Sequence, residues 1–143
     1  MIRSATKNDL DGVYTLIRQL SRHKFTNEQF EDCYLYTLEN DHILVYEQDE
    51  NIYGCGILSI NYPLDVSRRV AEIVELIVDE NVRSRGIGKK LIKALEQIAI
   101  DNSCVCITLG SGKPREAAHR FYKREGFADT HYKFTKELYV EVD

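Results

Sequence analysis

The sequence predicts a mixed α/β sheet that carries helices on both faces, and two observations lead to this class. Apolar and β-branched segments at 42–47, 52–60 and 70–78 follow one another with no helical pattern between them, which is typical of an antiparallel meander. An amphipathic segment at 86–100 then separates 70–78 from a further apolar segment at 104–109. A strand, a helix and a strand in this order require a parallel crossover. A mixed sheet with helices on both faces is the architecture that this order favours.

The N-terminal third is predicted to hold one short strand and two helices. Residues 1–5 form the strand, and Thr6 and Asp9 then make an approximate capping box, which marks the start of a helix. The first helix carries apolar residues at helical spacing, namely Leu10, Val13, Tyr14, Ile17 and Leu20. A second, weaker helical pattern covers 26–39.

The C-terminal part is predicted to hold a helix and closing strands. Pro114 opens the helix, which runs to Glu125, and Gly126 ends it. Residues 131–140 then form one or two strands. The predicted order of elements is therefore β-α-α-β-β-β-α-β-α-β.

Length and charge narrow the class of protein. A chain of 143 residues is the size of one domain, so we expect a single domain over 1–143. Its net charge of −4 has the wrong sign for a protein that binds DNA, which needs a broad basic face. No segment approaches the roughly 18 apolar residues that cross a membrane, and residues 1–7 lack the pattern of a signal peptide. We therefore expect a cytoplasmic protein with no nucleic-acid or membrane partner.

The four cysteines are Cys33, Cys55, Cys104 and Cys106. The last two form a Cys-x-Cys pair, but no second pair follows to complete a metal cage. Zinc binding or a disulfide is one interpretation of them. We favour the other, in which they are small buried apolar residues in a reducing compartment, and we predict no metal site.

The most informative segment is Val78-Asp79-Glu80-Asn81-Val82-Arg83-Ser84-Arg85-Gly86-Ile87-Gly88-Lys89-Lys90, between a predicted strand and a predicted helix. The first turn of a helix leaves backbone N–H groups without partners and carries the positive end of the helix dipole. Gly86 and Gly88 have no Cβ, so a phosphate can approach these N–H groups closely. The segment predicts a pyrophosphate site, although a tight turn with a solvated basic edge is the other interpretation. It matches neither the dinucleotide fingerprint nor the P-loop.

The segment Arg83-Ser84-Arg85-Gly86-Ile87-Gly88 resembles the Arg/Gln-x-x-Gly-x-Gly/Ala motif of the GNAT superfamily of N-acetyltransferases. Three further stretches are similar to that family, in the right order along the chain. They are Ile2-Arg3-Ser4-Ala5 with Asp9-Leu10, then Glu72-Ile73-Val74-Glu75-Leu76-Ile77-Val78, then Ala118-His119-Arg120-Phe121-Tyr122-Lys123-Arg124-Glu125-Gly126-Phe127. The resemblance covers essentially the whole chain.

The resemblance implies a fold, a co-substrate and a reaction. The fold is a mixed, mostly antiparallel central sheet of six to seven strands with helices on both faces. Acetyl-CoA donates the acetyl group directly to a primary amine, which we expect to belong to a small molecule. The pantetheine arm pairs with the backbone of Leu76, Ile77 and Val78, beside a splay that separates their strand from 104–109. Backbone amides of the loop hold the pyrophosphate, namely those of Arg83, Ser84, Arg85, Gly86, Ile87, Gly88 and Lys89.

One departure from the family pattern is informative. Many members carry Asn seven residues before the tyrosine of the late helix, and this chain has Arg115 there. The segments 115–122 and 131–136 are similar instead to a branch that includes aminoalkylphosphonate acetyltransferases. The departure puts an Asn-mediated cofactor contact in doubt and points toward a small, anionic amine as acceptor.

Tyr122 is the candidate catalytic acid. Amine acetylation needs two proton transfers, because an ammonium group must lose a proton before it attacks the thioester and the departing CoA thiolate gains one. A phenol can donate a proton to sulfur, and the resemblance places a tyrosine at this position. The other interpretation is an aromatic residue that packs beside Phe121 and Phe127.

Glu72 and Glu75 are the candidate catalytic bases. Both lie in a strand otherwise made of Val, Ala, Ile and Leu, where an unpaired carboxylate is costly. A spacing of three puts them on opposite faces of a regular strand, so only one can face a given cleft unless a bulge intervenes. By the resemblance, Glu72 matches the position where several family members carry a glutamate that acts as the catalytic base, and we favour it. A carboxylate paired with an arginine such as Arg3, and a base that acts through water, are the alternatives.

Several questions stay open at this stage. His119 and His131 could titrate near neutral pH, and Tyr34, Tyr36 and Tyr62 lie where the family builds its acceptor pocket, but all five could be structural. The chain could also be a catalytically inactive acetyl-CoA-binding regulatory module, a protein or peptide acetyltransferase, or a phosphate-binding domain of another family. The C-terminal strands could pair in a homodimer.

Overall fold

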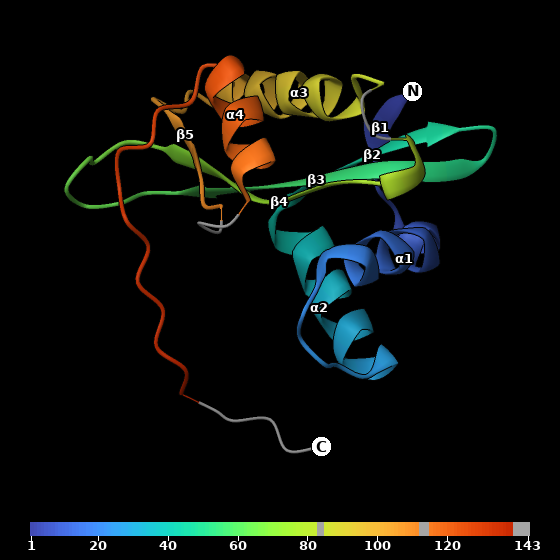
Figure 1. The fold of residues 1–143 in the computed structure, drawn as a ribbon. Helices are drawn as coiled ribbons and strands as arrows, with labels where there is room; N and C mark the ends of the chain where they lie inside the picture. The colour runs from blue at the N-terminus through green and yellow to red at the C-terminus, as the bar shows by residue number, and fades with distance from the viewer. Residues whose placement is uncertain (83–84, 112–114, 139–143) are drawn as a thin grey trace. The chain divides into compact units, whose positions relative to one another are not determined.

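The structure is a computed structural model that describes residues 1–82, 85–111 and 115–138. It divides into two compact units, Met1–Leu109 and Gly110–Asp143. The first unit holds the sheet and three α-helices. Its elements are β1 (Ile2–Ser4), η1 (Lys7–Asp9), α1 (Leu10–Leu20), α2 (Asn27–Asn40), β2 (His42–Gln48), β3 (Asn51–Asn61), β4 (Val70–Val78), η2 (Glu80–Val82), α3 (Ile87–Asp101) and β5 (Ile107–Leu109) (Figure 1). The second unit holds α4 (Glu116–Arg124).

The five described strands form one sheet in the order β1-β2-β3-β4-β5. The first three pairs are antiparallel, and β4 pairs with β5 in parallel. The predicted meander and the predicted parallel crossover through α3 are therefore both confirmed. Figure 1 shows α3 on one face of the sheet and α1 with α2 on the other, as the order of elements indicated.

The predicted number of six to seven strands is wrong for the part of the chain that the structure describes. Residues 131–138 lie in no strand, and the side chains of Tyr132, Phe134 and Leu138 are largely exposed, while residues 139 and 140 lie outside the described ranges. An alternating apolar pattern marks residues that could form a strand, but a strand also needs a neighbour that accepts its backbone hydrogen bonds. The strand β5 is shorter than the predicted 104–109, although Val105 N–H donates to Arg69 O at 2.9 Å and Cys106 O accepts Ala71 N–H at 3.0 Å.

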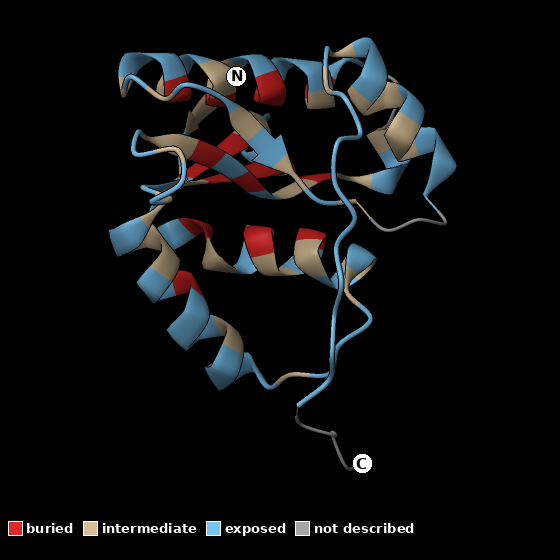
Figure 2. Cartoon of the chain, turned by 90° about the vertical axis from the view of Figure 1, so that its left-hand side faces the viewer, coloured by how far each residue is buried: buried red, intermediate tan, exposed pale blue. Residues whose placement is uncertain are grey.

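Buried residues of the first unit lie in the strands of the sheet and on helices that cover both of its faces (Figure 2). The layer under α1 and α2 is made of eight residues that pack on one another, namely Val13, Leu16, Tyr34, Ile43, Val45, Cys55, Ile57 and Ile77. On the other face, a Cβ added to Gly54 would lie 2.9 Å from Ile87 Cγ2 and 2.9 Å from Leu91 Cδ1. The glycine therefore lets α3 approach β3 closely and fixes the position of the helix start.

An ion-pair network ties the N-terminus to the sheet. The guanidinium group of Arg3 donates to both carboxylate oxygens of Asp9 at 2.8 Å and to Glu47 Oε1 at 2.9 Å. These hydrogen bonds hold the pKa of the Asp9 carboxyl below its usual range. Asp9 also accepts the backbone N–H of Thr6, which completes the predicted capping box. Arg3 is therefore paired with Asp9 and Glu47, whereas the sequence had suggested a glutamate of β4.

The cysteines differ in burial, and all four are free thiols. Cys55 is fully buried, Cys104 is half-buried, and Cys33 and Cys106 are exposed. The interpretation as buried apolar residues is therefore correct for Cys55 and wrong for Cys33 and Cys106. No described helix has both the length and the apolar character to cross a membrane.

Candidate active site

A bulge in β4 decides which way its two glutamates face. The register with β3 pairs Glu75 with Ile57 and Ile73 with Leu58, and so passes over Val74. Glu72 pairs with Ser59, two residues from Ile57 on β3. Directly paired residues of antiparallel strands point to the same face, and positions two apart on a strand share a face. Glu72 and Glu75 therefore lie on one face of the sheet, which is the face that α1 and α2 cover.

The surroundings of the two glutamates differ. Glu72 is exposed and lies beside Thr108 in the parallel pair of β4 and β5. Glu75 is half-buried and lies closer to the core of that face. Burial raises the pKa of the Cys55 thiol to about 12, and the charge of Glu75 adds to this shift. Glu75 is therefore an ionisable group at the edge of an apolar layer.

The edge of β4 continues well beyond β5. The parallel register ends where Ile73 pairs with Leu109, the last residue of β5. The segment from Val74 to Val78, which includes Leu76 and Ile77, extends past that point. The sequence predicts a splay between the strand that ends at Val78 and the strand at 104–109, and this stays a prediction.

The loop before α3 presents a helix start that no described side chain caps. Gly86 is the N-cap residue, with the left-handed backbone values φ 77° and ψ 10°, and no described residue other than its own chain neighbours comes within 4 Å of the position a Cβ would take. The first helical hydrogen bond runs from Lys90 N–H to Gly86 O, so the helix itself offers no acceptor to the N–H groups of Ile87, Gly88 and Lys89. Ile87 is buried and anchors the turn, whereas Arg85 and Lys89 are exposed. Arg83 and Ser84 lie outside the described residues.

A contact that the sequence reasoning missed holds the loop at its other end. The side chain of Gln19 on α1 is hydrogen-bonded both to the Asp79 carboxylate and to the backbone of Glu80. In the sequence, Gln19 is one polar residue of an amphipathic helix. Its partners follow 60 residues later, so no local pattern could have revealed the contact.

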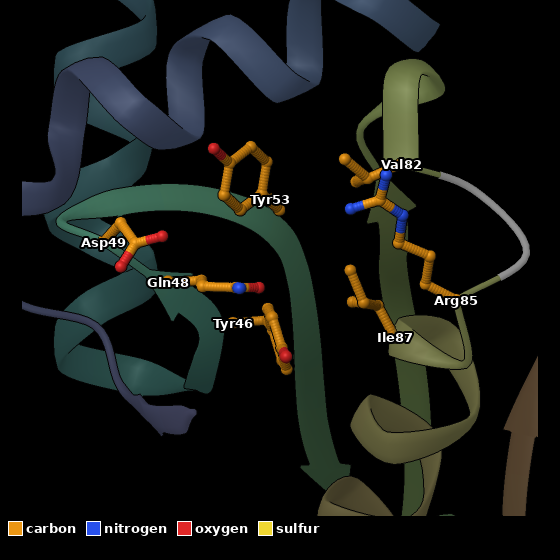
Figure 3. A pocket seen from close by; sticks show the side chains of 7 residues that line it. All are labelled: Tyr46, Gln48, Asp49, Tyr53, Val82, Arg85 and Ile87. Atoms are coloured by element: carbon orange, nitrogen blue, oxygen red, sulfur yellow. The ribbon is translucent and has the colours of Figure 1, made fainter.

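A hollow of about 200 Å³ lies between the tip of the β2–β3 hairpin and this loop (Figure 3). Its hairpin side is lined by Tyr46, Gln48, Asp49 and Tyr53, and its loop side by Val82, Arg85 and Ile87. Sites for whole cofactors usually measure roughly 300–1,000 Å³. The hollow is therefore too small to hold a molecule of the size of acetyl-CoA.

Tyr122 lies on α4 in the second unit. Its ring packs against Phe121 at 5.5 Å and against Phe127 at 6.1 Å between ring centroids. A phenol is protonated at neutral pH, and burial raises the pKa of the Tyr122 phenol further above its ordinary value, which makes it a weaker acid than a solvated tyrosine. The packing expected from the sequence is present, and a protonated phenol is the form that a catalytic acid requires.

The other aromatic and histidine candidates have mixed surroundings. Tyr34 is buried, and its hydroxyl donates to Thr6 O at 2.7 Å, which indicates a structural role. Tyr36 and Tyr62 are largely exposed, and Arg69 Nε donates to the Tyr62 hydroxyl. His131 is exposed, with its Nδ1 2.7 Å from the hydroxyl of Thr130.

Comparison with known proteins identifies the family. The model of the acetyltransferase (GNAT) family matches residues 10–127, which is most of the chain. The chain belongs to the GNAT acetyltransferase family. It is 32% identical over 139 residues to the aminoalkylphosphonate N-acetyltransferase of Salmonella typhimurium, and the match spans 96% of this chain and 90% of that protein.

Solved structures share this GNAT fold. A transcriptional regulator from Bacillus halodurans matches with a TM-score of 0.86 at 24% identity, over 96% of this chain and 99% of that one. An aminoglycoside N-acetyltransferase solved in complex with CoA also matches with a TM-score of 0.86, at 18% identity, over 96% of this chain and 93% of that one. At these identities the likeness shows the fold alone.

As a GNAT enzyme, the protein is an acyltransferase that uses acetyl-CoA as co-substrate. The chain offers features that fit this molecule. The open space around Gly86 and the uncapped N–H groups of α3 suit a phosphate. The positive charges of Arg85 and Lys89 beside them suit the same group.

Proposed function

We propose that the protein transfers the acetyl group of acetyl-CoA to the primary amine of a small, anionic molecule. The similarity to an aminoalkylphosphonate N-acetyltransferase over nearly the whole chain supports this class of acceptor. An aminoalkylphosphonate carries a primary amine and a phosphonate, so it is the first acceptor to test.

The cofactor would lie along β4 and on the loop before α3. Leu76, Ile77 and Val78 would supply backbone groups to the pantetheine arm, because this part of β4 runs past the end of β5. Backbone amides of Arg83, Ser84, Arg85, Gly86, Ile87, Gly88 and Lys89 would hold the pyrophosphate. The left-handed Gly86 supports this role, since a side chain there would occupy the space that a phosphate needs.

Proton transfers to and from the chain would accompany the reaction. Glu72 would accept the first proton of the acceptor ammonium group, directly or through water, and Glu75 is the alternative base. The neutral amine would attack the thioester carbonyl carbon, and the C–S bond would break as the tetrahedral intermediate collapses. Tyr122 would donate its phenolic proton to the departing CoA sulfur, and the acetylated nitrogen would give its surplus proton to the resulting phenolate, directly or through water. The Tyr122 hydroxyl is protonated at neutral pH, as a proton donor must be.

The observation that carries the proposal is the shared face of Glu72 and Glu75. A bulge at Val74 turns both carboxylates to the side of β4 opposite α3. An acceptor that approaches from the side of α1 and α2 would meet both carboxylates. An inactive acetyl-CoA-binding module would have no need of such a pair.

An assay of CoA thiol release tests the proposal. Aminomethylphosphonate and 2-aminoethylphosphonate are compared with alkylamines of the same length that lack an anionic group, a lysine-containing peptide and a peptide with a free N-terminus. We expect turnover with the phosphonates at least about tenfold faster than with the alkylamines. Faster turnover with a peptide would instead favour a protein acetyltransferase. Binding of acetyl-CoA without thiol release for any amine would indicate a regulatory module.

A further inference from the structure

Gln19 joins α1 to the loop that leads into α3 through two hydrogen bonds. Its Nε2 donates to Asp79 Oδ2 at 3.2 Å, and its Oε1 accepts the backbone N–H of Glu80 at 3.1 Å. Both polar ends of the carboxamide are therefore used at once. The two contacts bridge 60 and 61 positions of the chain.

Asp79 is the residue at which several elements meet. Its backbone N–H donates to Tyr53 O at 2.8 Å, which fixes the end of β4 to β3. Its other carboxylate oxygen accepts the N–H of Asn81 at 2.9 Å, and its carbonyl accepts the N–H of Val82 at 3.1 Å. The turn η2 is thus built on Asp79, and Gln19 attaches that turn to α1.

The distance along the chain from this attachment to the helix start is short. Glu80 and the N-cap residue Gly86 are six positions apart, and Ile87 anchors the far end in the core. Val82 at the end of η2 lines the same hollow as Arg85 and Ile87, so η2 lies beside the helix start. A binding segment whose neighbours hold it in place loses less conformational entropy when a ligand binds. Release of η2 from Gln19 would loosen this support for Arg85 and Ile87.

We infer that Gln19 is a positioning residue for acetyl-CoA, which acts by holding η2 beside the start of α3. This inference rests on the proposed pyrophosphate site at that helix start. Gln19 belongs to the polar side of α1, whereas Val13 and Leu16 attach the helix to the core. Loss of its side chain therefore affects the loop rather than the packing of α1.

The first experiment compares Gln19→Ala with Gln97→Ala. Gln97 is a matched control, because it also lies in a helix and donates from Nε2 to a carboxylate, Asp101 Oδ1 at 2.8 Å, but on the exposed side of α3. In Gln19→Ala we expect the Kd and KM for acetyl-CoA to rise about tenfold. The substitution removes the hydrogen bonds to the Asp79 carboxylate and to the Glu80 N–H, and the loss of a hydrogen bond to a charged group has an effect of this order. The turnover number at saturating acetyl-CoA should stay within about twofold. Gln97→Ala should bind as the unmodified protein does.

The second experiment exchanges the carboxylate and the carboxamide between positions 19 and 79, which restores their hydrogen bond. In Gln19→Glu, the new carboxylate can still accept the Glu80 N–H, but it repels Asp79, so acetyl-CoA should bind at least as weakly as in Gln19→Ala. In the double variant Gln19→Glu with Asp79→Asn, the amide at position 79 can donate to that carboxylate and still accept the Asn81 N–H. We expect tighter binding than the two single changes predict when added.

The outcomes separate this inference from the proposed site. If Gln19→Ala binds acetyl-CoA within twofold of the unmodified protein, or if the double variant shows no rescue, Gln19 does not position the loop. Gly86→Val is measured in the same series. Weak binding in Gly86→Val with normal binding in Gln19→Ala overturns only the role of Gln19, whereas normal binding in Gly86→Val overturns the proposed pyrophosphate site itself.

Discussion

Glu72 and Glu75 lie on the same face of β4 although three positions separate them, because the register with β3 passes over Val74. In a regular strand the two side chains would point to opposite faces. The bulge therefore lets two carboxylates serve one side of the sheet, and the choice of the base becomes a question that variants can answer.

We expect Glu72→Gln to lower the turnover number by about ten- to a hundredfold at neutral pH, within the usual range for a general base. The loss should shrink as the pH rises, because a larger fraction of the acceptor amine is then already deprotonated. The pH profile of turnover at saturating acetyl-CoA measures this. Glu75→Gln is the matched comparison, and a larger loss there would transfer the role of base to Glu75.

For Tyr122→Phe we expect the turnover number to fall by roughly ten- to a thousandfold while the Kd for acetyl-CoA stays unchanged. The substitution keeps the ring contacts with Phe121 and Phe127 and removes only the hydroxyl. Single-turnover kinetics and calorimetric binding separate the two quantities. Full activity would mean that solvent or another group protonates the thiolate.

Gly86→Val tests the loop against a control for backbone strain. Gly86 and Gly126 both have left-handed backbones, with φ values of 77° and 95°, and at neither does a described residue other than its own chain neighbours come within 4 Å of the position that a Cβ would take. Both valine variants should therefore lose a similar amount of stability, of the order of 1–2 kcal/mol. Only Gly86→Val should raise the KM for acetyl-CoA. An equal rise in Gly126→Val would trace the effect to strain.

The ion pair of Arg3 and Asp9 should stabilise the fold at neutral pH and lose its effect in acid. The folded-state pKa of Asp9 lies below the value of about 3.9 of an unfolded chain. Its contribution is therefore present above about pH 4 and disappears as the pH falls through the folded-state value. We expect Asp9→Asn to lower the free energy of unfolding by about 2 kcal/mol at pH 7.

Urea denaturation from pH 7 to pH 3 measures this difference. It should stay constant down to about pH 5 and shrink below about pH 4. Asp11→Asn, an exposed carboxylate in the first turn of α1, is the control and should change stability by less than about 0.5 kcal/mol. If the difference in free energy of unfolding persists at pH 3, the contribution of Asp9 comes from its hydrogen bond to the Thr6 N–H rather than from its charge.

Acetyl-CoA should raise the melting temperature, because a ligand that binds only the folded state stabilises it. At about 100 times its Kd the gain is about 2.7 kcal/mol, which corresponds to about 8 °C for a chain of this size. Dephospho-CoA should keep much of the effect, since the pyrophosphate is the proposed contact. A melting curve that acetyl-CoA leaves unchanged would contradict the proposed cofactor site.

Much of the fold could be predicted because its signals are local. The strand β4 was predicted at 70–78 and is found at Val70–Val78, and α3 was predicted at 86–100 and is found at Ile87–Asp101. Alternation, helical spacing, caps and glycines are encoded within a few neighbouring residues. The candidate loop was found in the same way, since Gly86 and its flanking charges are adjacent in the sequence.

The sequence by itself therefore determined the class of sheet, the order of the strands and α-helices from β1 to α4, and the position of the loop. Only the tertiary structure decided which face Glu72 and Glu75 share, because the bulge at Val74 depends on the register between two strands. It alone brought Gln19 to Asp79, and it alone left 131–138 outside the sheet. Each of these outcomes depends on contacts between distant parts of the chain. Contacts of this kind cannot be predicted from the local sequence around either partner.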